Sequence, residues 1–137
     1  FFISAMKVAE RKEQYRLLRE AVNSRDLKAV EQLLDNGMDA DCGKQLSEQT
    51  GLLLAITANS YEIAELLIDR KASVNVTNMS GETALYQAAK RDDITLVTLL
   101  LNASADPTIS SGSGKAPKDV TSDSSIRDVI ATSKHPT

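Results

Sequence analysis

The sequence predicts an all-α solenoid of about four helix–turn–helix repeats, with atypical repeats at both ends. Three observations support this fold class. The chain resembles itself at an offset of 33 residues, which is a period typical of repeat architectures. Aromatic residues make up 4% of the 137 residues while hydrophobic residues make up 42%, a balance that favours helices packed through aliphatic and small side chains. The third observation is a short segment, recurring in each repeat, that is apolar around most of a helical circumference.

The period is visible in pairs of segments that lie 33 residues apart. These pairs are Thr50–Ile56 with Thr83–Ala89, Ile63–Ile68 with Leu96–Leu101, and Gly81–Ala84 with Gly114–Pro117. An earlier segment, Leu33–Gly37, matches Leu67–Lys71 at an offset of 34. The sequence therefore predicts two full repeats in the middle of the chain and a partial repeat on each side.

Each full repeat is expected to contain two short helices. The four predicted helices are Thr50–Ala58, Tyr61–Arg70, Thr83–Arg91 and Ile94–Asn102. Thr83 can cap its helix by accepting a hydrogen bond from a free backbone N–H, and Asp92-Asp93 is expected to end that helix. Gly81 and Gly114 are expected in the turns between repeats, where glycine permits a positive φ.

The two ends depart from the repeat pattern. Residues Ile3 to Val22 carry apolar side chains at helical spacing and predict one long helix. This helix extends the first repeat as a cap or, alternatively, connects to a preceding domain. At the other end a short helix is expected over Ser125 to Thr132. The resulting domain prediction is a helical extension at 1–14, the repeat domain at 15–132 and a disordered tail at 133–137.

The predicted core combines leucines of the second helices with apolar residues of the first helices. Its members are Leu33, Leu34, Leu52, Ala55, Leu66, Leu67, Leu85, Ala88, Val97, Leu99 and Leu100.

These repeats resemble the ankyrin repeat. The resemblance is carried by Thr50-Gly51-Leu52-Leu53 with Ala72-Ser73-Val74-Asn75, and by Thr83-Ala84-Leu85-Tyr86 with Ala105-Asp106-Pro107-Thr108. It covers about Tyr15 to Ala131, and it implies a domain that binds another protein.

Three departures from the family pattern imply a stack of modest stability. Leu53 and Tyr86 replace the family's histidine, and Gly51 stands where proline is preferred. Lys71 and Ser104 occupy positions that are usually glycine.

The last repeat, from Asp106 to Arg127, also looks like the closing ankyrin repeat of long oxysterol-binding proteins and of ankyrin-containing GTPase-activating proteins for Arf. The match covers some twenty residues. It supplies an alternative function, in which the chain is the targeting segment of a lipid-transfer or membrane-traffic protein.

The sequence contains no constellation for catalysis, so we expect no enzyme, no cofactor and no metal. Gly112–Lys115 lacks the first glycine and the final Ser or Thr of a phosphate-binding loop and is interpreted as a repeat turn. His135 is the only histidine, and Cys42 has no evident partner. We interpret Asp92-Asp93 as helix-capping groups, and Glu62, Glu65 and Asp69 as a solvated helix face.

The charge balance limits the possible partners. A formal net charge of −3 with both signs spread along the chain argues against a nucleic-acid binder, which needs a basic face. No apolar stretch is long enough to cross a membrane. The single cysteine predicts a reducing, cytoplasmic setting. Because the chain begins at Phe1, we expect a fragment of a longer protein whose other domains are also partners.

The partner is expected to be a protein or peptide segment, bound by turn tips and the first-helix face. The predicted binding residues are Leu46, Gln49, Leu53, Met79, Glu82, Tyr86, Lys90 and Arg91. Leu46 and Met79 share one repeat position, at a turn tip, where a large apolar residue has little to pack against. Leu53 and Tyr86 share another, and the alternative for them is that they pack inward. The hypothesis is a groove around Met79 and Tyr86 that accepts an apolar anchor with nearby acidic groups.

Overall fold

The computed structural model describes residues 2–43 and 49–133, and these ranges fold into helices joined by turns. The helices are α1 (Phe2–Asn23), α2 (Leu27–Asp35), α3 (Gly51–Thr57), α4 (Tyr61–Asp69), α5 (Ala84–Lys90), α6 (Ile94–Asn102), α7 (Pro117–Val120) and α8 (Ser124–Thr132). Within these ranges the pairing of extended backbone is limited to one antiparallel bridge between Thr77 and Thr83. The all-α prediction is confirmed.

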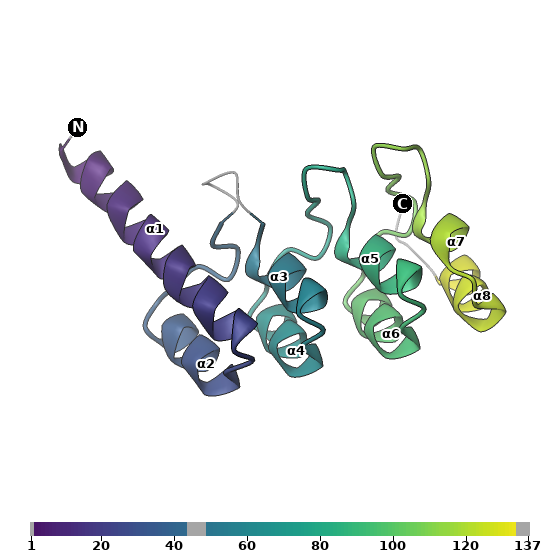
Figure 1. Cartoon of the computed structure of the whole chain (residues 1–137), viewed down its shortest axis with the longest axis horizontal. Coiled ribbons are helices and arrows are strands. Elements are labelled where there is room, and N and C mark those ends of the chain that lie inside the picture. The colour runs from purple at the N-terminus through teal and green to yellow at the C-terminus, as the bar shows by residue number, and fades with distance from the viewer. Residues whose placement is uncertain (1, 44–48, 134–137) are drawn as a thin grey trace. The chain divides into compact units, whose positions relative to one another are not determined.

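The chain divides into two compact units, which we call unit 1 (Phe1–Ser73) and unit 2 (Val74–Thr137). In unit 1, α1 packs on α2 and α3 packs on α4, while α1 contacts α3 and α2 contacts α4. Unit 2 repeats this arrangement with α5 on α6 and α7 on α8 (Figure 1). Each unit therefore consists of two helix pairs in two layers.

The observed helices match the predicted ones to within a residue at each end. Gly51–Thr57, Tyr61–Asp69, Ala84–Lys90 and Ile94–Asn102 lie inside the four predicted ranges. Aspartates begin three of the second helices: the carboxylates of Asp26, Asp93 and Asp123 accept hydrogen bonds from backbone N–H groups of α2, α6 and α8.

Two turn positions recur in the left-handed region of backbone space. The first joins the two helices of a pair and is occupied by Arg25, Asn59 and Asp92, with φ of 54°, 55° and 55°. The second follows the second helix and is occupied by Gly37, Lys71 and Ser104, with φ of 98°, 71° and 67°. Since only glycine adopts this conformation without strain, Lys71 and Ser104 reduce stability at the positions where the sequence comparison found glycine missing.

Aliphatic side chains fill the core of each unit. Of the residues predicted to be in the core, eight are buried: Leu34, Leu52, Ala55, Leu67, Leu85, Ala88, Val97 and Leu100. The other three, Leu33, Leu66 and Leu99, are half-buried. Helical periodicity places them on the apolar stripe, but they lie at its edge, where the neighbouring helix covers only part of each side chain.

The predicted long N-terminal helix is confirmed as α1. Its C-terminal half is the packed part, with Tyr15, Leu18 and Val22 buried, whereas residues 7–13 are exposed. The proposed division of the chain at residue 14 falls inside this continuous helix and stays a prediction.

Side-chain hydrogen bonds link successive repeats within each unit. In unit 1 the Asp41 carboxylate accepts from the Ser73 backbone N–H and hydroxyl, both at 2.7 Å. In unit 2 the Asn75 side-chain oxygen accepts from the Asp106 backbone N–H at 2.8 Å. Asp41 and Asn75 thus each hold, through a short polar side chain, the segment that follows the second helix of the next repeat.

Candidate functional site

The tip of the loop that precedes α5 is organised by one side chain, Asn78. Its Oδ1 accepts from the backbone N–H groups of Ser80 (2.9 Å) and Glu82 (3.0 Å). Its Nδ2 donates to Glu82 Oε1 at 3.0 Å. Gly81 completes the turn with φ of 74°. The backbone of this tip is therefore fixed from inside, which leaves its outward side chains available for contacts.

The loop tip before α7 contacts the loop tip before α5. Both tips belong to unit 2 and are neighbours in Figure 1. The backbone N–H of Gly112 donates to the Ser80 carbonyl at 2.8 Å. A Cβ on Gly81 would lie 2.8 Å from that same Gly112 nitrogen. Glycine is thus required at position 81 both for its positive φ and for the close approach of the two tips.

Met79 lies at the crest of the first tip and is fully exposed, with a relative exposure of 101%. The other large hydrophobic residues that are exposed in the described part of the chain range from 37% to 43%. An unbranched thioether of this kind can adapt to varied apolar partners. The expectation that Met79 stands free at a turn tip is confirmed.

The expectation that Leu53 and Tyr86 also stand on an exposed face is wrong. Leu53 has no exposed surface and Tyr86 is 5% exposed. The reason is that α3 and α5 are short helices enclosed by neighbours; α5, for example, packs on both α6 and α7 and buries five of its seven residues. The alternative prediction, inward packing at the position of the family's histidine, is the one that holds.

The remaining predicted binding residues lie as follows. Glu82 is half-buried and held by Asn78, while Lys90 and Arg91 are exposed at the end of α5. Gln49 is half-buried just before α3. Leu46 lies outside the described residues. The sequence interpretation missed Asn78, although an Asn followed within three residues by Gly is a recognisable turn signal.

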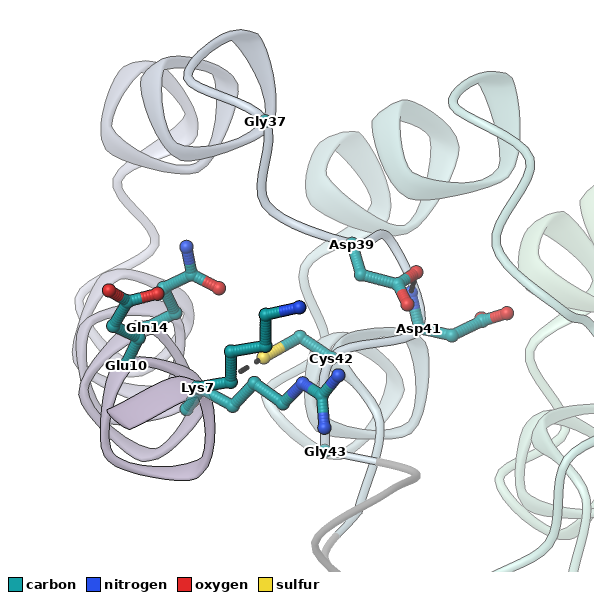
Figure 2. A pocket seen from close by; sticks show the side chains of 9 residues that line it. Lys7, Glu10, Gln14, Gly37, Asp39, Asp41, Cys42 and Gly43 are labelled. Carbon is teal, nitrogen blue, oxygen red and sulfur yellow. Dashed lines mark hydrogen bonds between the residues drawn. The ribbon is translucent and has the colours of Figure 1, made fainter. Parts of the chain in front are cut away.

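A separate cavity of about 340 Å³ lies in unit 1 beside the only cysteine (Figure 2). Lys7, Glu10 and Gln14 of α1 form one wall, and the loop with Asp39 and Cys42 forms the other. The Cys42 thiol is buried and donates to a backbone carbonyl at 3.9 Å. Burial, with a smaller contribution from the charge of Asp39, raises the pKa of the Cys42 thiol above its ordinary value. Such a thiol is a poor nucleophile at neutral pH.

The acidic pair after α5 has a structural role, and the helix-capping interpretation is confirmed for Asp93, whereas Asp92 bonds to the segment before α8. Asp93 caps α6 through the backbone N–H of Leu96 at 3.1 Å. Asp92 Oδ1 accepts from the Thr121 hydroxyl at 2.6 Å and from the Ser122 N–H at 2.9 Å. These hydrogen bonds, that of Thr121 first, hold the pKa of Asp92 below its usual value.

The interpretation of Gly112–Lys115 as a repeat turn is also confirmed. Gly114 has φ of 83°, the conformation of Gly81 one repeat earlier, and its N–H donates to the Ser111 carbonyl. Over the described ranges, no group of acidic, histidine or cysteine side chains is arranged to hold a metal ion. His135 lies outside those ranges.

Known proteins share this architecture. The sequence model of the family described as ankyrin repeats (3 copies) matches residues 18–111. The chain belongs to the ankyrin-repeat family. It is 32% identical over 114 residues to alpha-latrotoxin-Lg1a of Latrodectus geometricus, a match that covers 81% of this chain and 8% of the toxin. It is 36% identical over 89 residues to a B-cell lymphoma 3 protein homolog of Mus musculus, covering 65% of this chain and 20% of that protein.

The solved structures agree with this assignment. The crystal structure of the ankyrin repeat domain of Bcl-3 matches with a TM-score of 0.76 and 28% identity, over 83% of this chain and 50% of that one. The chain spans 8% to 20% of the length of the first curated relatives that it matches. Ankyrin repeats are a non-catalytic protein–protein interaction module. These relatives lend no support to a lipid-transfer or Arf-related function.

Among the described residues, no helix is both long enough and apolar enough to cross a bilayer.

Proposed function

We propose that this chain is the protein-binding part of a larger cytoplasmic protein, acting there as a scaffold or targeting arm. The proposal further places a principal contact at the tip of residues 78–82 in unit 2. The observation that carries it is the complete exposure of Met79 on a tip whose backbone is already hydrogen-bonded. Fixing a binding loop before the partner arrives reduces the entropy lost on association.

The charges of unit 2 define the chemistry of the partner. Lys90 and Lys115 are exposed, and neither forms an ion pair within the described ranges. The carboxylate of Glu82, which belongs to the tip itself, accepts a hydrogen bond from Asn78. A partner segment with an apolar side chain for Met79 and acidic groups for the lysines fits this surface. Gln49 and Leu46 remain predicted contacts at the corresponding tip of unit 1.

The test begins with a peptide display library selected against the whole chain, because the natural partner need not be known. The affinity of the selected peptides is then measured by fluorescence anisotropy for the native chain and for Met79→Ala. We expect a loss of about 2 kcal/mol, which is roughly a thirtyfold rise in Kd, if Met79 is a hot spot. We also expect the selected peptides to be acidic.

Ile94→Ala is the matched control, since Ile94 is another exposed hydrophobic residue of unit 2 but lies at the start of α6. This substitution is expected to leave the affinity unchanged. Selected peptides that bind Met79→Ala as tightly as the native chain would remove the tip from the binding site. Tyr86 is unsuitable for this test because it is buried, so its truncation would damage the fold.

A further inference from the structure

A groove of about 270 Å³ runs along α2 and α4 in unit 1, on the helix layer that carries neither the tips nor α3. It is lined by Leu27 and Glu31 of α2 and by Glu62, Glu65, Leu66 and Asp69 of α4. Its composition is an apolar floor of two leucines with four carboxylates around it. This surface plays no part in the function proposed above.

The floor can receive an apolar side chain. Leu27 and Leu66 are both half-buried, so part of each side chain faces the groove, whereas Ile63 and Leu67 of α4 are turned into the core. Covering the remaining apolar surface of the two leucines would be favourable for any partner of matching shape.

Within the described part of the chain, the four carboxylates of the groove have no basic neighbour within ion-pair distance. The ion pairs in the described part of the chain join Arg16 to Glu13 and Glu20, and Arg70 to Asp35. Glu31, Glu62, Glu65 and Asp69 are all exposed and take part in none of them. The groove therefore carries negative charge that no ion pair among the described residues neutralises.

Two features of these charges are unfavourable for α4 itself. Glu62 and Glu65 are three residues apart and Glu65 and Asp69 are four apart, so like charges face each other on one side of the helix. Asp69 is also the last residue of α4, where the helix dipole disfavours an anion, and the last turn contains no basic residue. Glu62 lies in the first turn, where the helix dipole favours an anion, so Glu65 and Asp69 are the acidic residues of α4 that do not serve the stability of their helix.

The fold does not require them either. At the same repeat positions, 33 residues later, α6 carries Thr95, Thr98 and Asn102, which are neutral. The leucine of the floor is retained, because Leu99 corresponds to Leu66. Unit 1 thus has a negative charge that unit 2 lacks at equivalent places of the same repeat.

We propose that the α2–α4 groove binds a basic amphipathic helix of a protein partner. Apolar residues of that helix would cover Leu27 and Leu66, and its lysines or arginines would pair with the surrounding carboxylates. The carboxylates of α4 extend over eight residues, from Glu62 to Asp69, or about 10 Å along the helix axis, which matches basic side chains on two turns of a partner helix. Like charge excludes nucleic acids and anionic lipid surfaces. The partner of this groove is opposite in charge to the acidic segment proposed for unit 2.

The probe for the test is a fluorescein-labelled 15-residue helical peptide of Leu, Lys and Ala, with its leucines on one face. Its affinity is measured by fluorescence anisotropy against the full chain at low and at physiological ionic strength. The neutralised variant combines Glu62→Thr, Glu65→Thr and Asp69→Asn, which are the residues that α6 already uses. We expect its Kd for the peptide to be roughly tenfold higher, the sum of several exposed ion pairs, and the difference to shrink with added salt.

Two controls distinguish binding in the groove from non-specific attraction between opposite charges. A variant with the same change in net charge elsewhere combines Glu10→Thr, Glu13→Thr and Asp128→Asn, and it should bind like the native chain. A peptide of identical composition whose leucines are shuffled off the common face should bind more weakly. Methyl NMR of the native chain should show the largest shifts at Leu27 and Leu66.

The proposal is overturned by unchanged affinity of the neutralised variant, by an equal loss in the charge-matched variant, or by equal binding of the shuffled peptide. A loss of binding can be distinguished from a loss of folding, because the thermal unfolding of the neutralised variant is measured as well. The substitutions remove like-charge repulsion from α4 but replace two glutamates by threonine, a poorer helix former, so the melting temperature should stay close to that of the native chain.

Discussion

Thr50 and Thr83 occupy the same position in consecutive repeats, yet only the side chain of Thr83 caps the helix that follows. Both precede a first helix with nearly the same extended backbone, φ and ψ of −69° and 164° for Thr50 and of −83° and 169° for Thr83. The Thr83 hydroxyl accepts from the Tyr86 N–H at 3.1 Å. The Thr50 hydroxyl is buried and has no hydrogen-bond partner among the described residues. Equivalent backbone therefore does not guarantee equivalent side-chain bonding.

The same contrast extends to the residue that follows each threonine. Gly51 follows Thr50, and a Cβ there would lie 3.1 Å from Leu18 and 3.2 Å from Leu67. Ala84 follows Thr83 and is accommodated in the core. The glycine that the sequence showed only as a departure from the family pattern is thus explained by close packing of α1 and α4 against α3.

The largest expected effects test whether the two repeats bury leucine side chains at the same repeat positions. Leu67 and Leu100 are equivalent and have no exposed surface. Leu67→Ala and Leu100→Ala should each lower the free energy of unfolding by about 2–5 kcal/mol, because each removes buried methyl groups and leaves a cavity. Urea unfolding monitored by circular dichroism measures the change. The half-buried pair Leu66→Ala and Leu99→Ala should cost less, and equal losses in both pairs would contradict the burial pattern.

An intermediate effect is expected from the two threonines, and it differs in sign. Thr83→Val should destabilise the chain by about 1 kcal/mol, since it removes the hydrogen bond that caps α5. Thr50→Val should be neutral or stabilising, because it replaces a buried hydroxyl that has no partner by a methyl group of similar shape. Thermal unfolding of the two variants under identical conditions makes the comparison. Equal destabilisation by both would mean that Thr50 caps α3 after all.

A third effect concerns the order of the unit 2 tip. Asn78→Ala removes three hydrogen bonds around this tip and should raise the hydrogen-exchange rates of the Ser80 and Glu82 amides. The expected cost in unfolding free energy is about 1 kcal/mol. Asn102→Ala serves as the control, since Asn102 is exposed at the end of α6. Unchanged exchange at Ser80 would show that Asn78 does not hold the tip.

The smallest effect is a dependence on pH. Because the folded-state pKa of Asp92 is lowered by the Thr121 hydroxyl and then by the Ser122 N–H, its contribution to stability is present above the unfolded value of about 4. That contribution is lost as the pH falls through the lower folded value. Asp92→Asn should therefore be less stable than the native chain at pH 7, and the difference should shrink toward acid. A difference that is constant with pH would contradict this role.

The sequence predicted the helices well because their signals are local. Apolar spacing, capping residues and the 33-residue period placed four helices to within a residue at each end. Burial of Leu53 and Tyr86 was not predictable in the same way, since it depends on which helices enclose α3 and α5 from other parts of the chain. The Asn78 hydrogen bonds and the contact between Ser80 and Gly112 were missed for a similar reason. They depend on loop geometry that periodicity does not describe.

The proposed binding tip can be tested directly through the methionine methyl groups. The chain contains three methionines, and Met38 is buried while Met79 is fully exposed. In a chain labelled with ¹³C at the methionine methyls, titration with an acidic peptide from the display selection should shift the Met79 signal and leave the Met38 signal in place. A Met79 signal that stays unchanged at saturating peptide would contradict the placement of the partner at this tip.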